Sequence, residues 1–153
     1  MPTNLKNQKE EKHALLVRTL ALPQATRAII LSYIQDAEIV SFMNLACEAI
    51  GVKLISNIDN LAQEWADAFI SDILTENIPT ALLMKNGVIP IIPAENPLKK
   101  SLTEFNPMKF EWNAFLFEKA DKFQMFATLV RYLENIRYPG DKRVLLQNVG
   151  KGI

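Results

Sequence analysis

The residues of this chain that could do chemistry are mainly carboxylates. Asp59, Glu64, Asp67 and Asp72 fall in or beside one predicted helical segment, and two of them could converge as a general acid and a general base. The same spacing is more typical of a solvated helix face, which is the interpretation we favour. An enzyme with a dispersed carboxylate site is therefore kept as an alternative hypothesis.

The single thiol and the single imidazole offer little catalytic chemistry. Cys47 falls within a predicted helix among apolar residues, where a free cysteine is usually a small buried hydrophobe. One cysteine excludes an internal disulfide, a zinc site built from several thiolates and a two-thiol redox centre. His13 has no nucleophile pattern beside it, so we expect a surface or helix-cap position. We assign no catalytic residue, no metal site and no cofactor.

The composition argues against several classes of ligand. The 153 residues include 17 basic and 17 acidic side chains, and none of the 5 glycines belongs to a phosphate-binding array. Balanced charge gives no net field that would draw the protein to nucleic acid or to anionic lipid, so neither partner is expected. The sequence contains no signal-peptide pattern and no apolar run long enough to span a bilayer, which predicts a cytoplasmic protein.

The elements that would position these residues alternate between strands and helices. Apolar runs predict buried strands over 27–34 and 52–59. Helical spacing of apolar residues predicts helices over 10–22, 39–50, 60–76 and 121–136. Asp36 and Gly51 fit the start and the end of the second of these helices. The strand, helix and strand in succession favour a parallel pair with a right-handed crossover.

Residues 81–92 predict a β-hairpin. The stretches "ALLM", "KNGV" and "IPII" fit a strand, a turn and a strand, because Asn86-Gly87 accepts positive φ at both central positions of a type I′ turn. Pro90 cannot donate a ladder hydrogen bond, so the second arm is expected at the edge of the sheet. An antiparallel hairpin would make the sheet mixed.

A single domain is expected over 1–153. Within it we predict a flexible arm over 1–8, a globular part over 9–138 and a tail over 139–153. Residues 93–108 contain three prolines and fit a long surface connection.

Aromatic side chains are concentrated between residues 105 and 138. Core packing is the first explanation, but their number also suggests that a partner or a second protomer covers some of them at an interface. Phe110 and Trp112 are therefore candidate partner contacts. Residues 109–117 fit a helix or a strand, with a preference for a strand.

The segment Ile78-Pro79-Thr80, followed by Lys85-Asn86-Gly87, resembles a segment of thioredoxin-like proteins in which a proline precedes the terminal hairpin. The order of predicted elements from Arg27 to Ile92 is also similar to the core of that fold. The resemblance implies an α/β fold with a three-layer mixed sheet flanked by helices, here with an N-terminal helical arm and an extended C-terminal segment. It also implies that Pro79 occupies the family's cis-proline position, although the sequence leaves cis and trans open.

The thioredoxin-like catalytic centre has no counterpart in this sequence. The place of the family's Cys-x-x-Cys pair reads "IQDAEIV", so the resemblance implies a redox-inactive protein. It also implies a retained peptide-binding surface, formed by Gln35 and Asp36 with Ile78, Pro79 and Thr80. We therefore predict a non-catalytic protein-binding or assembly module, such as an adaptor, an accessory subunit or a dedicated chaperone. A structural subunit of a larger assembly, such as a phage or secretion machine, is the second alternative, and a homo-oligomer is left open.

Overall fold

The protein is built around a five-stranded parallel sheet with strand order β2-β1-β3-β4-β5. The computed structural model describes residues 5–98, 100–104 and 112–151. The strands are β1 (Ala28–Ser32), β2 (Val52–Ile55), β3 (Ala68–Ile70), β4 (Ile89–Pro93) and β5 (Phe115–Phe117). Each neighbouring pair is parallel. The α/β class is confirmed, and the expected mixed sheet is wrong.

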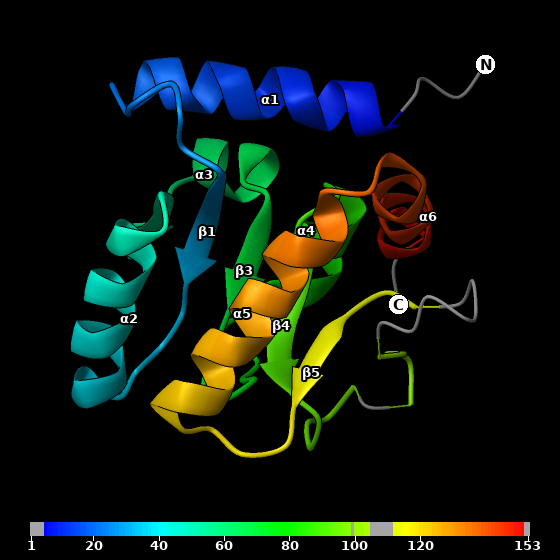
Figure 1. Ribbon diagram of the computed structural model, residues 1–153. Helices are drawn as coiled ribbons and strands as arrows, with labels where there is room; N and C mark the ends of the chain where they lie inside the picture. Colours follow the sequence, from blue (N-terminus) through cyan, green and yellow to red (C-terminus); the bar gives the residue numbers. More distant parts are fainter. Residues whose placement is uncertain (1–4, 99, 105–111, 152–153) are drawn as a thin grey trace.

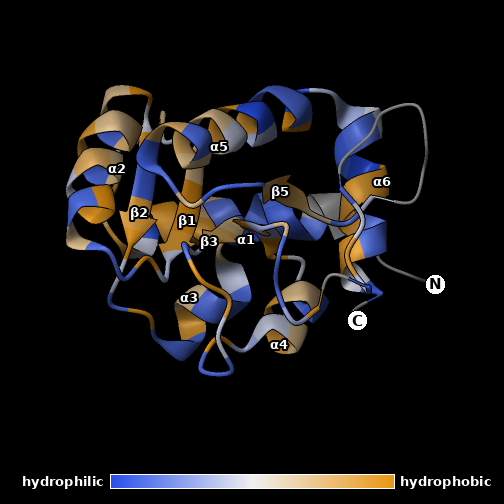
Figure 2. Ribbon diagram, turned by 90° about the horizontal axis from the view of Figure 1, so that it is seen from below, coloured by the Kyte–Doolittle hydropathy of each residue, from blue (hydrophilic) through white to orange (hydrophobic). Residues whose placement is uncertain are grey.

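Six helices surround this sheet in the described part of the chain. They are α1 (Leu5–Thr19), α2 (Ala37–Ala49), α3 (Asn60–Trp65), α4 (Thr80–Lys85), α5 (Lys122–Ile136) and α6 (Pro139–Gly150). Helices α2 and α5 cover one face, and α3 and α4 lie on the other (Figure 2). The strands point downward in Figure 1, and helix α1 crosses above their amino-terminal ends. Within the described ranges, no helix is long and apolar enough to cross a membrane.

The central strands are buried on both faces. Every residue of β1, β3 and β4 is buried, as expected for a parallel sheet with helices on both sides. The strand predicted over 27–34 is confirmed as β1. The strand predicted over 52–59 is shorter and ends at Ile55, because the chain turns there toward α3.

The helix predicted over 60–76 is wrong beyond Trp65. The chain leaves the helix at Ala66, which has an extended backbone, and then forms β3 between β1 and β4. Phe69 in β3 is fully buried and lies edge-on to Tyr33, with the ring centroids 6.2 Å apart. Burial on both faces of the sheet therefore overrides the helical spacing of the apolar residues.

The predicted hairpin over 81–92 is also wrong. Residues Thr80–Lys85 form α4, which buries Leu83 and Met84. Asn86 has a φ of −80° and Gly87 a φ of +76°, so the pair ends a helix instead of forming a type I′ turn. Strand β4 then runs parallel to β3 and lies inside the sheet.

Pro90 is tolerated inside the sheet because of its register. Ile89 donates its amide to the Asp67 carbonyl, and Ile91 accepts a hydrogen bond from the Ser71 amide, so both face β3. The backbone of Pro90 faces β5 instead, where regular pairing starts one residue later with Ile91 and Phe115. A missing amide at this position breaks no bond of the β4–β5 ladder.

The two ends of the chain contain helix where the sequence predicts none. Helix α1 begins at Leu5, inside the predicted arm, and residues 1–4 lie outside the described residues. Residues of the predicted tail form α6, which buries Leu145, Leu146 and Val149.

The thioredoxin-like fold is contradicted by this topology. The resemblance requires an antiparallel hairpin after Pro79, whereas Pro79 immediately precedes α4. None of the described peptide bonds is cis, so Pro79 follows a trans bond. The short "IPT" and "KNG" matches therefore begin and end a helix.

Candidate functional site

A cavity of about 480 Å³ opens at the carboxyl-terminal ends of β3 and β4. Its walls come from the segment between β3 and α4, from α4 itself, and from the connection after β4. The lining residues are Leu74, Thr75, Glu76, Ile78, Pro79, Thr80, Ala81, Leu82, Pro97 and Leu98. A cavity of this size fits a small-molecule site, and in open α/β sheets ligands bind outside the carboxyl ends of the strands.

Local hydrogen bonds fix both walls of this cavity. On the β3 side, the Ser71 hydroxyl accepts the Ile73 amide at 3.2 Å. On the β4 side, the Asn96 side chain donates to the Pro93 carbonyl at 2.6 Å and accepts the Leu98 amide at 2.7 Å. Side chains that hold their own backbone in this way preorganise a cleft before a ligand arrives.

Asp72 joins the end of β3 to the turn between β1 and α2. Its carboxylate oxygens accept the backbone amides of Gln35 and Asp36 at 3.1 and 3.0 Å. The Asp36 carboxylate in turn accepts the Ile39 amide at 3.1 Å, which confirms the predicted N-cap of α2. The strand order reverses between β1 and β3, so this contact lies at the topological switch point of the sheet.

Asp67 lies at the opposite end of β3. One of its oxygens accepts the Ile29 amide at 2.8 Å and lies 2.6 Å from His13 Nδ1. His13 Nε2 lies 3.1 Å from the Thr26 carbonyl, so both ring nitrogens face acceptors and the protonated imidazole is favoured. The hydrogen bond with Asp67 raises the pKa of His13 above its usual 6.5.

Asp67 and Asp72 therefore do not form an acid–base pair. They are five residues apart along an extended strand, which corresponds to roughly 16 Å. Both carboxylates also accept backbone amides. The interpretation of these two residues as part of a solvated helix face is wrong, because the segment that carries them is a strand and its ends. Asp59 caps α3 through the Ala62 amide at 2.8 Å.

The structure brings five of the predicted site residues to the same edge of the sheet. Ile78, Pro79 and Thr80 line the cavity, and Ile78 and Thr80 are largely buried. Gln35 and Asp36 lie in the turn that Asp72 holds. Ile78, Pro79 and Thr80 thus border a cavity beside a short helix, and Gln35 and Asp36 are not among its lining residues, so the peptide groove that the resemblance implies is not formed.

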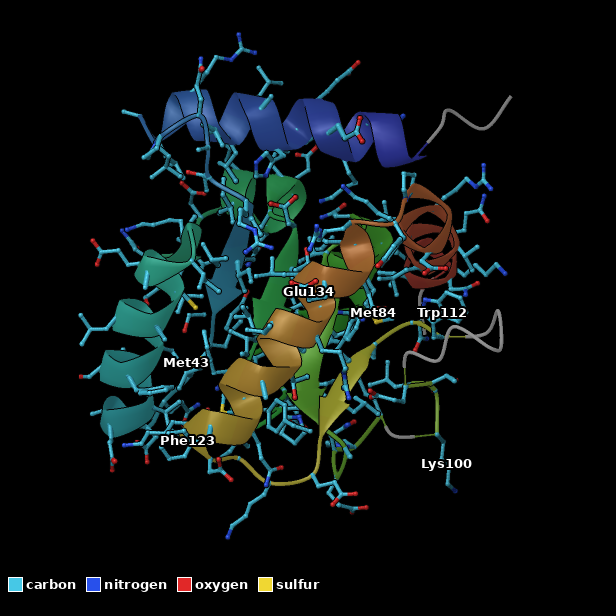
Figure 3. All side chains as sticks on the ribbon, viewed as in Figure 1. Met43, Met84, Lys100, Trp112, Phe123 and Glu134 are labelled. Carbon is cyan, nitrogen blue, oxygen red and sulfur yellow. The ribbon has the colours of Figure 1, made fainter. Side chains whose placement is uncertain are left out.

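Trp112 is not a surface residue. Its side chain is 1% exposed, and it lies beside α6, where the Asn148 side chain donates to the Trp112 carbonyl at 2.9 Å (Figure 3). The prediction of a partner contact is wrong for Trp112, because core packing takes up the aromatic ring. Phe110 lies outside the described residues.

The sequence did not identify Asp72 as the residue that binds the β1–α2 turn to the end of β3. The signal is the polar pair Ser71-Asp72 directly after three apolar residues, which marks the carboxyl end of a buried strand. The apolar residues of 60–76 also have helical spacing, so the end of the strand was placed inside a predicted helix.

Cys47 is expected to be unreactive in the folded protein. The side chain is 1% exposed, and burial raises the pKa of its thiol to about 12. The thiolate fraction near neutral pH then falls by roughly a thousandfold relative to a free cysteine. Reaction with a chromogenic disulfide reagent at pH 8 should be very slow without denaturant and complete within minutes in concentrated urea. Rapid labelling of the native protein would contradict this burial.

Two solved structures share the fold of this chain. The catalytic domain of starch synthase IV from Arabidopsis thaliana, bound to ADP and acarbose, superposes with a TM-score of 0.73 at 18% identity, over 99% of this chain and 41% of that one. Sucrose-phosphate synthase from Thermosynechococcus elongatus gives a TM-score of 0.58 at 16% identity, over 97% of this chain and 45% of that one. The likeness establishes the fold. The superposed region covers 41% and 45% of the two neighbours, so this chain spans less than half the length of either one. No sequence-family profile and no curated protein sequence matches it.

These comparisons correct the predicted function. The non-catalytic, redox-inactive binding module was inferred from a thioredoxin-like fold, whereas the fold is the one found in two glycosyltransferases. The prediction of a non-catalytic adaptor is therefore corrected, because the fold on which it rested is not the fold of this chain.

Proposed function

We propose that this chain is one lobe of a glycosyl-transferring enzyme, and that the cavity beside α4 holds part of its substrate. The observation that carries the proposal is the position of the cavity, at the carboxyl ends of β3 and β4 and next to the point where the strand order reverses. In open parallel sheets this crevice is the usual place for a ligand. Starch synthase IV was solved with ADP and acarbose, which supports a sugar or a nucleotide as the ligand class.

The walls of the cavity suit a ring with hydroxyl groups at its rim. Aliphatic side chains such as Leu74, Ile78 and Leu98 would cover the flat faces of the ring and exclude water. The Glu76 carboxylate is exposed and would accept hydrogen bonds from hydroxyl groups. Because this chain covers less than half of either neighbour, we propose that transfer itself requires a further lobe.

The proposal is tested by filling the cavity. Ala81 is exposed in α4 and lines the cavity, so Ala81→Trp places an indole in it without disturbing the core. Ala127 is also exposed, on α5, which lies on the opposite face of the sheet, so Ala127→Trp is the matched control (Figure 2). Binding of adenosine, ADP and maltose would be measured by calorimetry and by chemical shifts of labelled protein.

We expect at least one of the three ligands to shift the amide signals of the cavity residues. Its affinity should fall by about tenfold or more in Ala81→Trp and stay unchanged in Ala127→Trp. The proposal fails if none of the ligands shifts those signals, or if both variants weaken binding equally.

A further inference from the structure

Hydrocarbon side chains form most of the wall of the cavity beside α4. Of the ten described residues that line it, seven are apolar, among them Leu74, Ile78, Leu82 and Leu98. None of the described lining residues carries a positive charge. The wall therefore offers a ligand many dispersion contacts and few hydrogen bonds.

The polar side chains of the wall have little capacity left for a sugar inside the cavity. Thr80 donates its hydroxyl to the Ile78 carbonyl at 3.4 Å. Glu76 is exposed, so its carboxylate lies at the rim. Among the described side chains of the wall, the Thr75 hydroxyl alone is both buried and without a hydrogen-bond partner. One hydroxyl of the protein would thus have to serve all the hydroxyl groups of a buried sugar ring.

Backbone amides of the wall are engaged as well. The Ile78 amide donates to the Thr75 carbonyl at 3.2 Å, and the Leu98 amide donates to the Asn96 side chain at 2.7 Å. Pro79 has no amide hydrogen to donate. A sugar ring in the interior would therefore leave most of its hydroxyl groups unpaired, and each unpaired buried hydroxyl costs free energy. The interior suits a hydrocarbon group better than a sugar.

The apolar wall extends to the surface of the protein. Leu82 lines the cavity and is 49% exposed, and Ile73, directly before the lining residue Leu74, is 54% exposed. Exposed aliphatic side chains next to an apolar cavity are typical of a binding site. Removing such surface from water is the main driving force for binding a hydrocarbon group.

We propose that the substrate of this site is a glycoside with an aliphatic aglycone, whose hydrocarbon chain fills the cavity while its sugar stays at the rim beside Glu76. This inference rests on the proposed function and narrows it, because the cavity interior then holds the hydrocarbon and only the rim contacts the sugar. Each methylene group in the cavity adds to the affinity. The hydroxyl groups of the sugar keep water and the Glu76 carboxylate as partners.

The experiment uses methyl, butyl, hexyl and octyl β-D-glucoside as probes, each below its critical micelle concentration. Dissociation constants would be measured by calorimetry, and the binding site would be located from amide chemical shifts of labelled protein. Leu82→Gln places a polar amide group on the exposed part of the wall and keeps a good helix-forming residue in α4. Leu45→Gln is the matched control, because Leu45 is 72% exposed on α2, on the opposite face of the sheet (Figure 2).

The affinity should rise by about twofold to fourfold for each methylene group added between butyl and octyl glucoside. The upper factor corresponds to about 0.8 kcal/mol for a fully buried methylene group. The longer probes should shift the amide signals of Ile78 and Leu98. Leu82→Gln should lower the affinity for octyl glucoside by about threefold or more and leave that for methyl glucoside unchanged, whereas Leu45→Gln should bind the whole series as the wild type does.

Three results would overturn the proposal. The first is an affinity that does not rise with chain length. The second is a rise with chain length that leaves the signals of Ile78 and Leu98 unmoved, because the probes then bind elsewhere. The third is an equal loss of affinity in Leu82→Gln and Leu45→Gln.

The same probes separate this inference from the proposed function. If maltose or ADP shifts the cavity signals and octyl glucoside binds no better than methyl glucoside, the proposed function stands and the aliphatic aglycone is wrong. If the alkyl series rises as expected while adenosine, ADP and maltose shift nothing, the hydrocarbon site is supported and a free sugar or nucleotide as the ligand class is wrong.

Discussion

Substitution of Phe69 by alanine is expected to lower the free energy of unfolding by about 3–5 kcal/mol, the range for deleting a fully buried aromatic ring. Phe69 is 0% exposed, lies in the central strand β3 and packs edge-on against Tyr33. Domains of this size are stable by only about 5–15 kcal/mol, so the variant should lose a large part of its stability. Urea unfolding followed by circular dichroism measures the change.

Phe123→Ala is the control for this prediction. The Phe123 ring is 68% exposed although it contacts Phe42, so its removal should cost less than about 1 kcal/mol. The comparison also tests the strand assignment, because Phe69 lies at the centre of the sheet only if β3 exists. Equal effects of the two substitutions would show that Phe69 is not in a buried strand.

Substitution of Asp67 by asparagine is expected to lower the free energy of unfolding by about 2–3 kcal/mol. The Asp67 carboxylate accepts both the Ile29 amide and His13 Nδ1, and the two side chains are only 14% and 23% exposed. The variant keeps one acceptor oxygen but loses the charge that holds His13 protonated. The pKa of His13, which the wild-type contact raises, should return toward 6.5. His13 is the single histidine, so its ring protons can be followed directly by NMR.

The contact between His13 and Asp67 also determines whether the free energy of unfolding rises or falls with pH. The folded-state pKa of His13 is raised above 6.5, so the stability that it contributes is fully present below pH 6.5 and is lost as the pH rises through the folded-state value. Lys9 acts in the opposite sense, because burial lowers the pKa of its ammonium group to about 8. The protein is therefore stabilised as the pH rises from about 8 to 10.5, where the folded state has lost this proton and the unfolded state still holds it. The difference between wild type and His13→Gln isolates the histidine contribution.

Glu64→Gln is the control for Asp67→Asn. The Glu64 side chain is 55% exposed and lies 3.9 Å from Lys12, so neutralising it should change stability by less than about 0.5 kcal/mol. If Asp67→Asn is equally mild, or leaves the pKa of His13 unchanged, the buried pair does not hold α1 against the sheet.

Some helix ends and one of the fully buried strands were predictable from the sequence. The Asp36 cap, the strand β1 and the helix α5 all appear where local residue patterns predict them. Gly51 has a φ of +76°, which explains why the chain turns there after α2. These features depend on neighbours a few residues away, so the local sequence contains the relevant information.

The candidate site was only partly predictable. Ile78, Pro79 and Thr80 were selected through a resemblance that proved wrong, yet they line the cavity because the segment after a central parallel strand lies at the carboxyl edge of the sheet. Asp72 was attributed to a helix face, since its partners, Gln35 and Asp36, lie more than 30 residues earlier in the chain. No local pattern records such a contact.

The sequence by itself determined the α/β class, the alternation of strands and helices and the caps of α2. Only the tertiary structure decided that "AFI" is a central strand, that "TALLMK" is a helix and that β4 is parallel to β3. Short apolar runs fit either kind of element, and the choice depends on what covers them. In a parallel sheet those covering residues come from helices and strands far away in sequence, so the fold and the switch-point contact of Asp72 emerge only when the whole sheet is assembled.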